Sequence, residues 1–219
     1  MNRYAVLLAV VLALATSSAE GAADPRKILR IASADIDTLD PHQYNDSPSF
    51  DVLSAIFEGL YEWDYLGSPS KLVPVGAAAL PEIRDGGKEW TIRVRPGIYF
   101  TDDPAFGGKA REVTAEDWVY SLKRWLDPNL RRGGDPIVSD LLVDARAVVD
   151  AARKPGATLD YDRPMSGLRV IDRYTLQLKL KQPNYPNIEG FLTTGAIARE
   201  VVQAAGIDIR TRAVGSGPY

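Results

Sequence analysis

The chain has 219 residues, of which 45% are hydrophobic and 25% charged, the balance of an ordinary globular protein. Its formal net charge is -3, and its Lys and Arg are mixed with acids rather than gathered as a nucleic-acid-binding face requires. It contains no cysteine and one histidine, which excludes thiol nucleophiles, thiolate metal sites and two-histidine metal sites. We therefore expect no nucleic-acid partner, no metal and no cofactor.

The N-terminus has the pattern of a cleavable secretory signal peptide. Arg3 precedes an apolar run at residues 4–15, and small residues follow at 17–19 and 21–23. The run is shorter than the roughly 20 residues that span a bilayer, which argues against a membrane anchor. We predict a signal peptide over residues 1–23, with cleavage after Ala19 as the alternative. Without a cysteine to carry a lipid, the mature protein is expected free in the periplasm.

The next elements follow from turn residues and apolar spacing. Residues 28–33 predict a strand, and residues 37–42 a turn-rich loop. Ser47 as N-cap, followed by Pro48, predicts the start of a helix. Its buried face is expected to hold apolar residues at helical spacing: Phe50, Leu53, Ile56, Phe57 and Leu60. The Gly/Ser/Pro segment at 67–70 predicts a boundary between subdomains.

Mixed strands and helices continue through the rest of the chain. Alternation at Trp90, Ile92 and Val94 predicts a half-exposed antiparallel strand. Thr114 is expected to cap a helix with a buried stripe from Trp118 to Leu126. Further predictions are one helix at 139–153, a hairpin at 168–180 turning at 172–173, and a helix at 196–205 closed by Gly206. This order favours an α/β or α+β fold.

The residues offer little support for catalysis. His42 lies in a turn and is expected at the surface. A Ser-His-Asp triad around it is formally possible, but no G-x-S-x-G elbow is present. The acidic pairs at 102–103 and 116–117 fit a loop and a first helical turn better than a calcium loop. We predict that the protein is not an enzyme, with an exported hydrolase as a minor alternative.

Aromatic residues are more suggestive of ligand binding. Tyr44, Phe57, Tyr61, Trp63 and Tyr65 surround the end of the predicted helix near Gly59. Clefts that bind small molecules are commonly lined by aromatic side chains. Each of these residues taken alone fits core packing better than a binding site, and both interpretations stay open.

Several linked motifs resemble the family 5 extracellular solute-binding proteins, which serve the oligopeptide, dipeptide and nickel importers. They are LPE at 80–82, DGGKEWTIRVRPGIYF at 85–100 and VTAEDWVYS at 113–121. Supporting pieces are LDP at 39–41, FEGL at 57–60, DRYTL at 172–176 and GSGPY at 215–219. The resemblance covers nearly all of the chain after the signal peptide.

The resemblance implies an α/β fold of the type II periplasmic-binding-protein kind, with two lobes. Residues 24–66 and 173–219 would form the first lobe, and residues 67–172 a family-specific subdomain of it. Members are usually more than twice this long, and residues 214–219 hold no terminal element. We therefore expect a truncated chain without the second lobe. A non-functional fragment is the alternative to a binding protein.

The resemblance also implies the ligand and the partners. The expected role is the periplasmic substrate-binding component of an ABC importer. It would be a monomer that captures oligopeptides or dipeptides and delivers them to an inner-membrane permease. The backbone at Glu58, Gly59, Leu60 and Tyr61 would bind an extended peptide as an added strand does. Tyr44, with Ser216 and Gly217, gives weaker candidate contacts. A nickel ligand is disfavoured by the single histidine.

Overall fold

The computed structural model describes residues 33–218, without the side chains of residues 207 and 208. The predicted signal peptide and all but the last residue of the predicted strand at 28–33 lie outside this range. Asp35–Tyr219 form one compact unit, and all elements named below belong to it. The division into a lobe at 24–66 and 173–219 and a subdomain at 67–172 stays a prediction.

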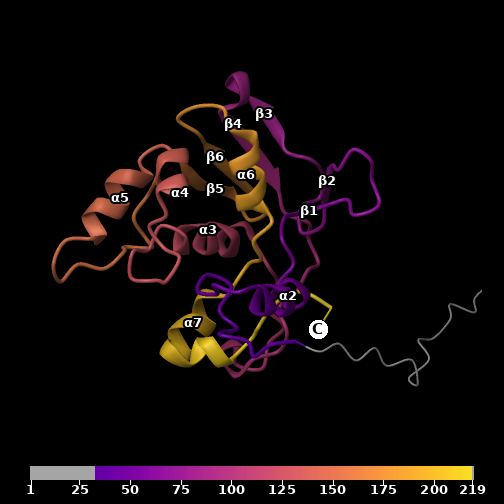
Figure 1. The fold of residues 1–219 in the computed structure, drawn as a ribbon, viewed down its shortest axis with the longest axis vertical. Coiled ribbons are helices and arrows are strands. Elements are labelled where there is room, and N and C mark those ends of the chain that lie inside the picture. The colour runs from indigo at the N-terminus through magenta and orange to yellow at the C-terminus, as the bar shows by residue number, and fades with distance from the viewer. Residues whose placement is uncertain (1–32, 219) are drawn as a thin grey trace, which may run out of the picture. The chain divides into compact units, whose positions relative to one another are not determined.

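The larger of the two sheets in the described chain is four-stranded and antiparallel, in the order β3-β4-β6-β5 (Figure 1). Its strands are β3 (Glu82–Arg84), β4 (Glu89–Arg93), β5 (Leu168–Asp172) and β6 (Thr175–Lys179). The 3-10 helix η1 (Asp85–Gly87) joins β3 to β4. Strands β5 and β6 are the predicted hairpin, whose turn lies at residues 172–175. Strand β6 pairs with β4 across a long separation in sequence.

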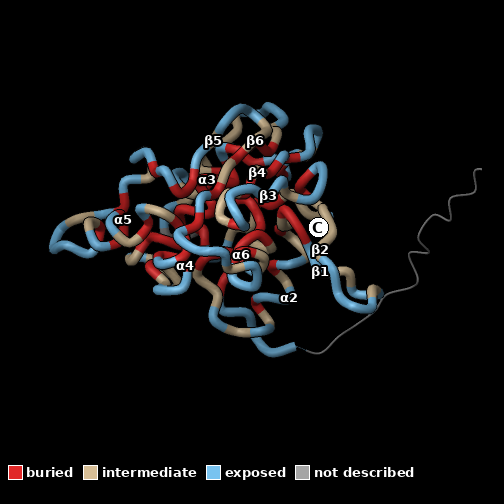
Figure 2. Tube along the Cα trace, turned by 90° about the horizontal axis from the view of Figure 1, so that it is seen from above, coloured by how far each residue is buried: buried red, intermediate tan, exposed pale blue. Residues whose placement is uncertain are grey.

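One face of this sheet is buried and the other is polar. Trp90 pairs with Leu178, and Ile92 pairs with Leu176. All four residues are at most 1% exposed, which confirms the alternation seen in the sequence. Figure 2 shows buried residues where β4 and β6 run. On the outer face Arg169 donates to Gln177, which in turn donates to Thr91. In the described part of the chain, helix α3 (Ala115–Arg124) packs against the sheet, and Arg169, Gln177 and Thr91 form a polar outer face.

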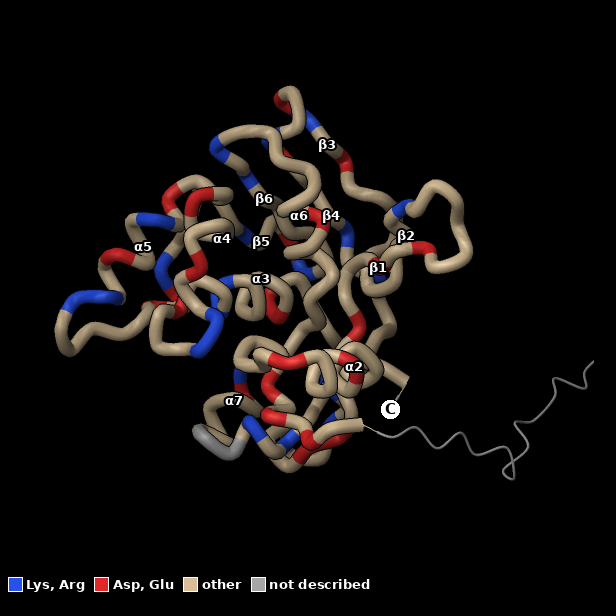
Figure 3. Tube along the Cα trace, in the orientation of Figure 1, with Lys and Arg blue, Asp and Glu red and all other residues tan. Residues whose placement is uncertain are grey.

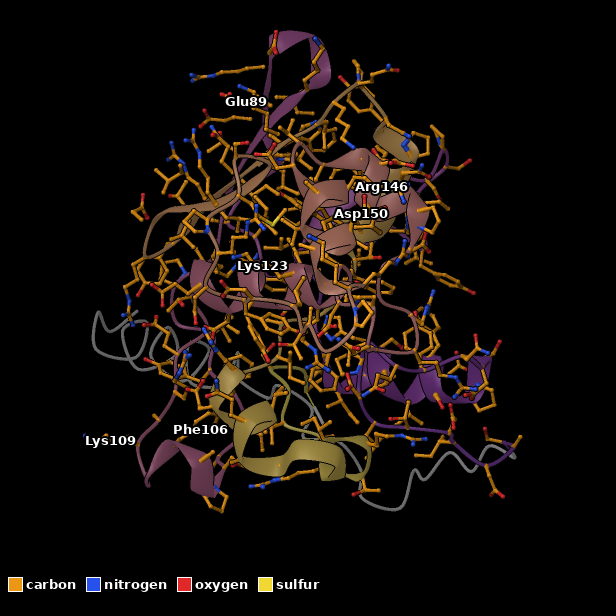
Figure 4. The ribbon with its side chains drawn as sticks, turned by 90° about the vertical axis from the view of Figure 1, so that its left-hand side faces the viewer. Glu89, Phe106, Lys109, Lys123, Arg146 and Asp150 are labelled. Carbon is orange, nitrogen blue, oxygen red and sulfur yellow. The ribbon has the colours of Figure 1, made fainter. Side chains whose placement is uncertain are left out.

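Helix α3 (Ala115–Arg124) packs on β5 and β6 and has the predicted start and face. The Asp117 carboxylate accepts hydrogen bonds from the backbone N–H of Thr114 at 2.8 Å and from its hydroxyl at 3.0 Å. The stripe from Trp118 to Leu126 is buried as expected. Lys123, labelled in Figure 4, donates from Nζ to the carbonyl oxygens of Tyr161 and Arg163. These bonds hold the 161–163 loop against the helix.

The single helix predicted at 139–153 is wrong. The structure has two helices, α4 (Pro136–Leu141) and α5 (Ala145–Ala152). Between them Leu142 is extended and forms an antiparallel bridge with Leu180. Asp144 then takes a left-handed conformation with φ 63°. The apolar period continues through the break because Leu142 still points into the core, where it is fully buried.

Three further helices and a short ribbon complete the unit. Helix α2 (Ser47–Ile56) is the predicted helix, but its N-cap is Asp46 rather than Ser47. Strands β1 (Tyr61–Trp63) and β2 (Leu72–Pro74) form a two-stranded antiparallel ribbon, so residues 67–70 lie in a hairpin loop. Helix α6 (Tyr185–Leu192) was not predicted, and α7 (Arg199–Ala205) starts later than expected. Two 3-10 helices are η2 (Pro104–Phe106) and η3 (Gly206–Thr211). Within residues 33–218, no helix has the length and hydrophobicity to cross a membrane.

Candidate ligand-binding site

A cavity of about 590 Å³ lies among α2, β1, α6 and the segment that follows α3. Seven aromatic residues contribute to its wall: Tyr44, Phe50, Phe57, Tyr61, Trp63, Trp125 and Phe191. Its charged lining residues are Glu58, Glu62 and Arg132. A mostly apolar wall with a few charged groups is the usual composition of a small-molecule site.

The first wall is placed by the N-terminal cap of α2. Asp46 accepts hydrogen bonds from the backbone N–H and the hydroxyl of Ser49, at 2.7 and 2.9 Å. This fixes the start of the helix, so that Phe50 lies 5.7 Å from Tyr44 between ring centroids. Phe50 was predicted to be buried, but it is 51% exposed. Its ring faces the cavity instead of the core.

The second wall is the backbone around Gly59, where two segments cross at close range. Gly59 forms an antiparallel bridge with Gly195. A Cβ atom at Gly59 would lie 2.5 Å from the Thr193 carbonyl oxygen. The glycine therefore allows close approach, as the sequence suggested, but the approaching backbone belongs to the chain itself.

Leu60 and Tyr61 extend this wall into the ribbon. The Leu60 N–H donates to the Leu192 carbonyl at 3.1 Å, and its own carbonyl accepts from Val75 and Ala77. Its side chain is fully buried. The Tyr61 hydroxyl donates to the Ala79 carbonyl at 3.1 Å, and burial raises the pKa of this phenol. Tyr61 therefore acts in the wall as a neutral side chain.

The third wall comes from α6 and the turn after it, which sequence reasoning missed. Asn187, Gly190 and Phe191 of α6 line the cavity, with Thr193 to Gly195. A signal was present: Asn184 caps the helix and a proline lies in its first turn. Ile188, Phe191 and Leu192 also recur at helical spacing. The many turn-forming residues around 182–187 concealed this pattern.

The fourth wall holds a stacked cation. Arg132 lies over the rings of Tyr44 and Trp125, with Cζ 4.4 and 5.0 Å from their centroids. The turn that carries it folds back on α3, because Gly134 donates its N–H to the Trp125 carbonyl at 2.9 Å. Neighbouring Gly133 passes so close to the Asp127 carbonyl that a Cβ atom would be 1.6 Å from its oxygen.

Behind Trp125 lies a buried ionic cluster, and the surface position predicted for His42 is wrong. His42 is 1% exposed, and its ring makes an edge contact with Trp125 at 5.8 Å. Arg124 donates from Nε to His42 Nδ1 at 3.2 Å and from Nη2 to Asp40 at 2.6 Å. Burial and the charge of Arg124 together lower the pKa of His42 to about 4. The imidazole is therefore neutral near pH 7, with its proton on Nε2.

The same cluster has a strong effect on Asp40. Although burial alone would raise its pKa, the hydrogen bonds that its carboxylate accepts and the charge of Arg124 hold it well below the usual range. Asp40 also accepts from the backbone N–H of His42 at 2.9 Å and from Gln43 at 2.6 Å. The carboxylate thus fastens the 38–43 loop to α3, next to the cavity wall.

The predicted site residues divide into two groups. Tyr44, Glu58, Gly59 and Tyr61 line the cavity, whereas Leu60 lies behind it. Ser216 and Gly217 lie outside its lining, although the next residue, Pro218, contributes to it. Gly217 donates to the Ile56 carbonyl at 2.8 Å, which ties the segment to the end of α2. Of the five clustered aromatics, only Tyr65 is outside the lining, and it is 94% exposed.

The charged residues of the cavity wall do not belong to a larger patch of one charge among the described residues. Lys and Arg are interspersed with Asp and Glu along the described chain (Figure 3). Within residues 33–218, no group of three or more His, Asp or Glu side chains is arranged to hold a metal ion. The cavity can therefore offer a ligand apolar contacts, one guanidinium group and two carboxylates.

Comparisons with known proteins identify the family. The model for bacterial extracellular solute-binding proteins, family 5 Middle, matches residues 71–219. The periplasmic oligopeptide-binding protein OppA of Salmonella typhimurium is 30% identical over 186 residues, 81% of this chain and 30% of that protein. The glutathione-binding protein GsiB of Shigella dysenteriae is 27% identical over 98% of this chain and 35% of its own length.

A solved structure agrees with these relatives. The structure of Listeria monocytogenes OppA bound to peptide aligns with a TM-score of 0.66 and 25% identity, over 85% of this chain and 34% of that chain. The chain thus spans about a third of the length of the relatives it matches. The predicted α/β, type II periplasmic-binding-protein-like fold is confirmed, and the relatives are binding proteins rather than enzymes. The chain belongs to the bacterial extracellular solute-binding proteins of family 5.

Proposed function

We propose that this chain contributes the binding cavity of a periplasmic substrate-binding component of an ABC importer. It captures oligopeptides or dipeptides for delivery to an inner-membrane permease. The observation that carries the proposal is the aromatic-lined cavity, in a chain that aligns over most of its length with an oligopeptide-binding protein. Seven aromatic rings offer apolar contact to side chains of varied shape.

The proposed ligand contacts are Tyr44, Glu58, Gly59 and Tyr61. Glu58 lines the cavity and has no hydrogen-bond or ion-pair partner among the described residues. Its carboxylate is therefore free to pair with an ammonium group of a peptide. Tyr44 and Tyr61 supply aromatic surface, while the Gly59 bridge fixes the backbone between them.

The proposal includes export of the protein to the periplasm. Residues 1–23 serve as a cleavable signal peptide, and the chain holds no cysteine for lipid attachment. The mature protein is then a periplasmic monomer that is not a lipoprotein. It meets its permease at the outer face of the inner membrane.

A thermal-shift screen of the chain against mixed tri- to pentapeptides tests the proposal. Binding at a hundred times Kd would stabilise the folded state by about 2.7 kcal/mol and raise Tm. An equimolar mixture of free amino acids is the control. Stabilisation by no peptide would contradict the proposal and favour a fragment without binding activity of its own.

A matched pair of variants locates the binding site. Phe50 and Tyr99 are both 51% exposed, but only Phe50 lines the cavity. We expect Phe50→Ala to weaken the binding of a peptide found in the screen by about 1–2 kcal/mol, because it removes aromatic contact area. Tyr99→Ala is expected to leave the affinity unchanged. Equal losses in both variants would place the ligand elsewhere.

A further inference from the structure

We propose that Arg132, whose guanidinium lies over the rings of Tyr44 and Trp125, is a carboxylate anchor that selects peptides with a free acid group at this end of the cavity. The proposal rests on the proposed function and adds a charge requirement to it. A guanidinium presents five N–H donors in one plane, and contacts over ring faces leave these donors available.

The donors of Arg132 have no partner among the described residues. Among residues 33–218 its polar interactions are those over the two rings, although it lines the cavity and is half-buried. Adjacent Arg131 differs, since it is an exposed cation paired with Asp37. Arg124 is also paired, with Asp40. Arg132 is therefore a cation held at the cavity with its hydrogen-bonding capacity unused by residues 33–218.

A second donor lies in the same wall. The indole Nε1 of Trp125 is buried and has no acceptor among the described residues, while the residue as a whole is 8% exposed. A buried donor without an acceptor destabilises the protein, commonly by about 1–3 kcal/mol. Trp125 lines the cavity and Arg132 lies over its ring, so a ligand oxygen bound beside Arg132 is a candidate acceptor for this N–H. The unpartnered indole N–H is thus a second donor in the residues that line this end of the cavity.

The anchor is fixed before any ligand arrives. The turn is closed by the hydrogen bond from Gly134 to Trp125, and Gly133 packs directly against the Asp127 carbonyl. Stacking on two rings holds the guanidinium itself. Such preorganisation reduces the ordering cost of binding, which favours a specific geometry over a loose charge contact.

The surroundings favour a carboxylate over a more highly charged anion. Glu58 and Glu62 line the same cavity, so its charged residues carry a formal net negative charge. A dianion such as phosphate would be repelled, whereas a monoanion accepts a bidentate bond from the guanidinium fork. In a peptide this group is the C-terminal carboxylate or an Asp or Glu side chain.

Calorimetry with defined probes tests the anchor. The probes are tetraalanine, its C-terminal amide, and amidated Ala-Ala-Asp-Ala with its Asn counterpart. We expect wild type to bind one acid-bearing probe about ten- to a hundredfold more tightly than its neutral partner. Arg132→Gln should abolish that preference, and Arg132→Lys, which keeps the charge but loses the fork, should reduce it. Arg131→Gln is the matched control and should retain it.

The outcomes separate the anchor from the proposed function. Preference for tetraalanine over its amide identifies the C-terminus as the source, and preference for the Asp peptide identifies a side chain. Peptide binding with no acid preference, or a preference that survives Arg132→Gln, overturns the anchor and leaves the proposed function standing. If no peptide binds, the proposed function fails, and an acetate titration followed by NMR at the arginine Nε–H groups decides the anchor alone. A saturable shift at Arg132 but not at Arg131 supports it, and equal responses overturn it.

Discussion

Replacing Gly59 by alanine tests the close crossing that forms one wall of the cavity. The new Cβ atom would meet the Thr193 carbonyl oxygen at 2.5 Å and carbon at 2.8 Å, and the Tyr61 carbonyl oxygen at 2.9 Å. All three are backbone atoms, so no side-chain rotation relieves the overlap. The two segments must separate, which strains the Gly59–Gly195 bridge.

The expected cost follows from the two effects of this substitution. Overpacking of an ordered interior costs about 1–3 kcal/mol. Alanine also restricts the unfolded chain, which returns about 0.4–1 kcal/mol where the backbone tolerates it. We expect Gly59→Ala to lower the free energy of unfolding by about 1–2 kcal/mol. Urea unfolding followed by the fluorescence of the four tryptophans measures this as a lower midpoint at unchanged slope.

Gly190 supplies the control for the same chemical change. It lies within α6, and a Cβ atom there would have no neighbour within 4 Å. Gly190→Ala should therefore raise the free energy of unfolding by about 0.5–1 kcal/mol, since glycine weakens a helix interior. The two variants are expected to shift the midpoint in opposite directions. If Gly59→Ala were as stable as wild type, the argument from the crossing would be refuted.

Three further predictions concern the supports of the cavity. Because the pKa of His42 is lowered to about 4, the unfolded chain takes up its proton first as the pH falls through 6.5. The contribution of His42 to the free energy of unfolding is fully present above pH 7 and is lower by about 2 kcal/mol at pH 5. In urea unfolding measured at several pH values, His42→Gln should therefore flatten the fall in stability between pH 7 and pH 5. An equal slope in the variant would contradict this origin. Gly133→Ala should lower the urea midpoint and weaken peptide binding, since its Cβ atom would be 1.6 Å from the Asp127 oxygen; unchanged affinity would show that the turn does not position the wall. Asp46→Ala should lower the free energy of unfolding in urea by about 1 kcal/mol, because the backbone N–H of Ser49 loses the carboxylate that caps α2. An unchanged free energy of unfolding would mean that another group replaces this carboxylate.

Local pattern was a good guide wherever the structure is decided locally. The alternation around Trp90 and Ile92 predicted both the strand and its buried face. The acids after Thr114 predicted the start of α3, because a helix cap depends on residues within one turn. The Gly206 position at the end of α7 follows from the same short-range rule.

Predictions failed where a distant partner decides the conformation. Leu142 departs from helical geometry to form a bridge with Leu180, and no residue near it in sequence predicts this departure. His42 is buried because Arg124, far along the chain, gives its ring a donor. The family resemblance predicted the fold that single positions did not, since linked motifs report on distant pairing that local propensity cannot.

The placement of the cavity residues explains why the site was only half visible in the sequence. Tyr44 and Tyr61 stood out because aromatics beside a glycine are conspicuous. Arg132 did not, because an arginine in a glycine-rich loop resembles an ordinary solvated charge. Its position depends on three contacts outside its own turn: the α3 terminus, the Tyr44 loop and the cluster behind Trp125. A residue fixed by several distant contacts but left without a charged partner is one whose partner is to be sought in the ligand.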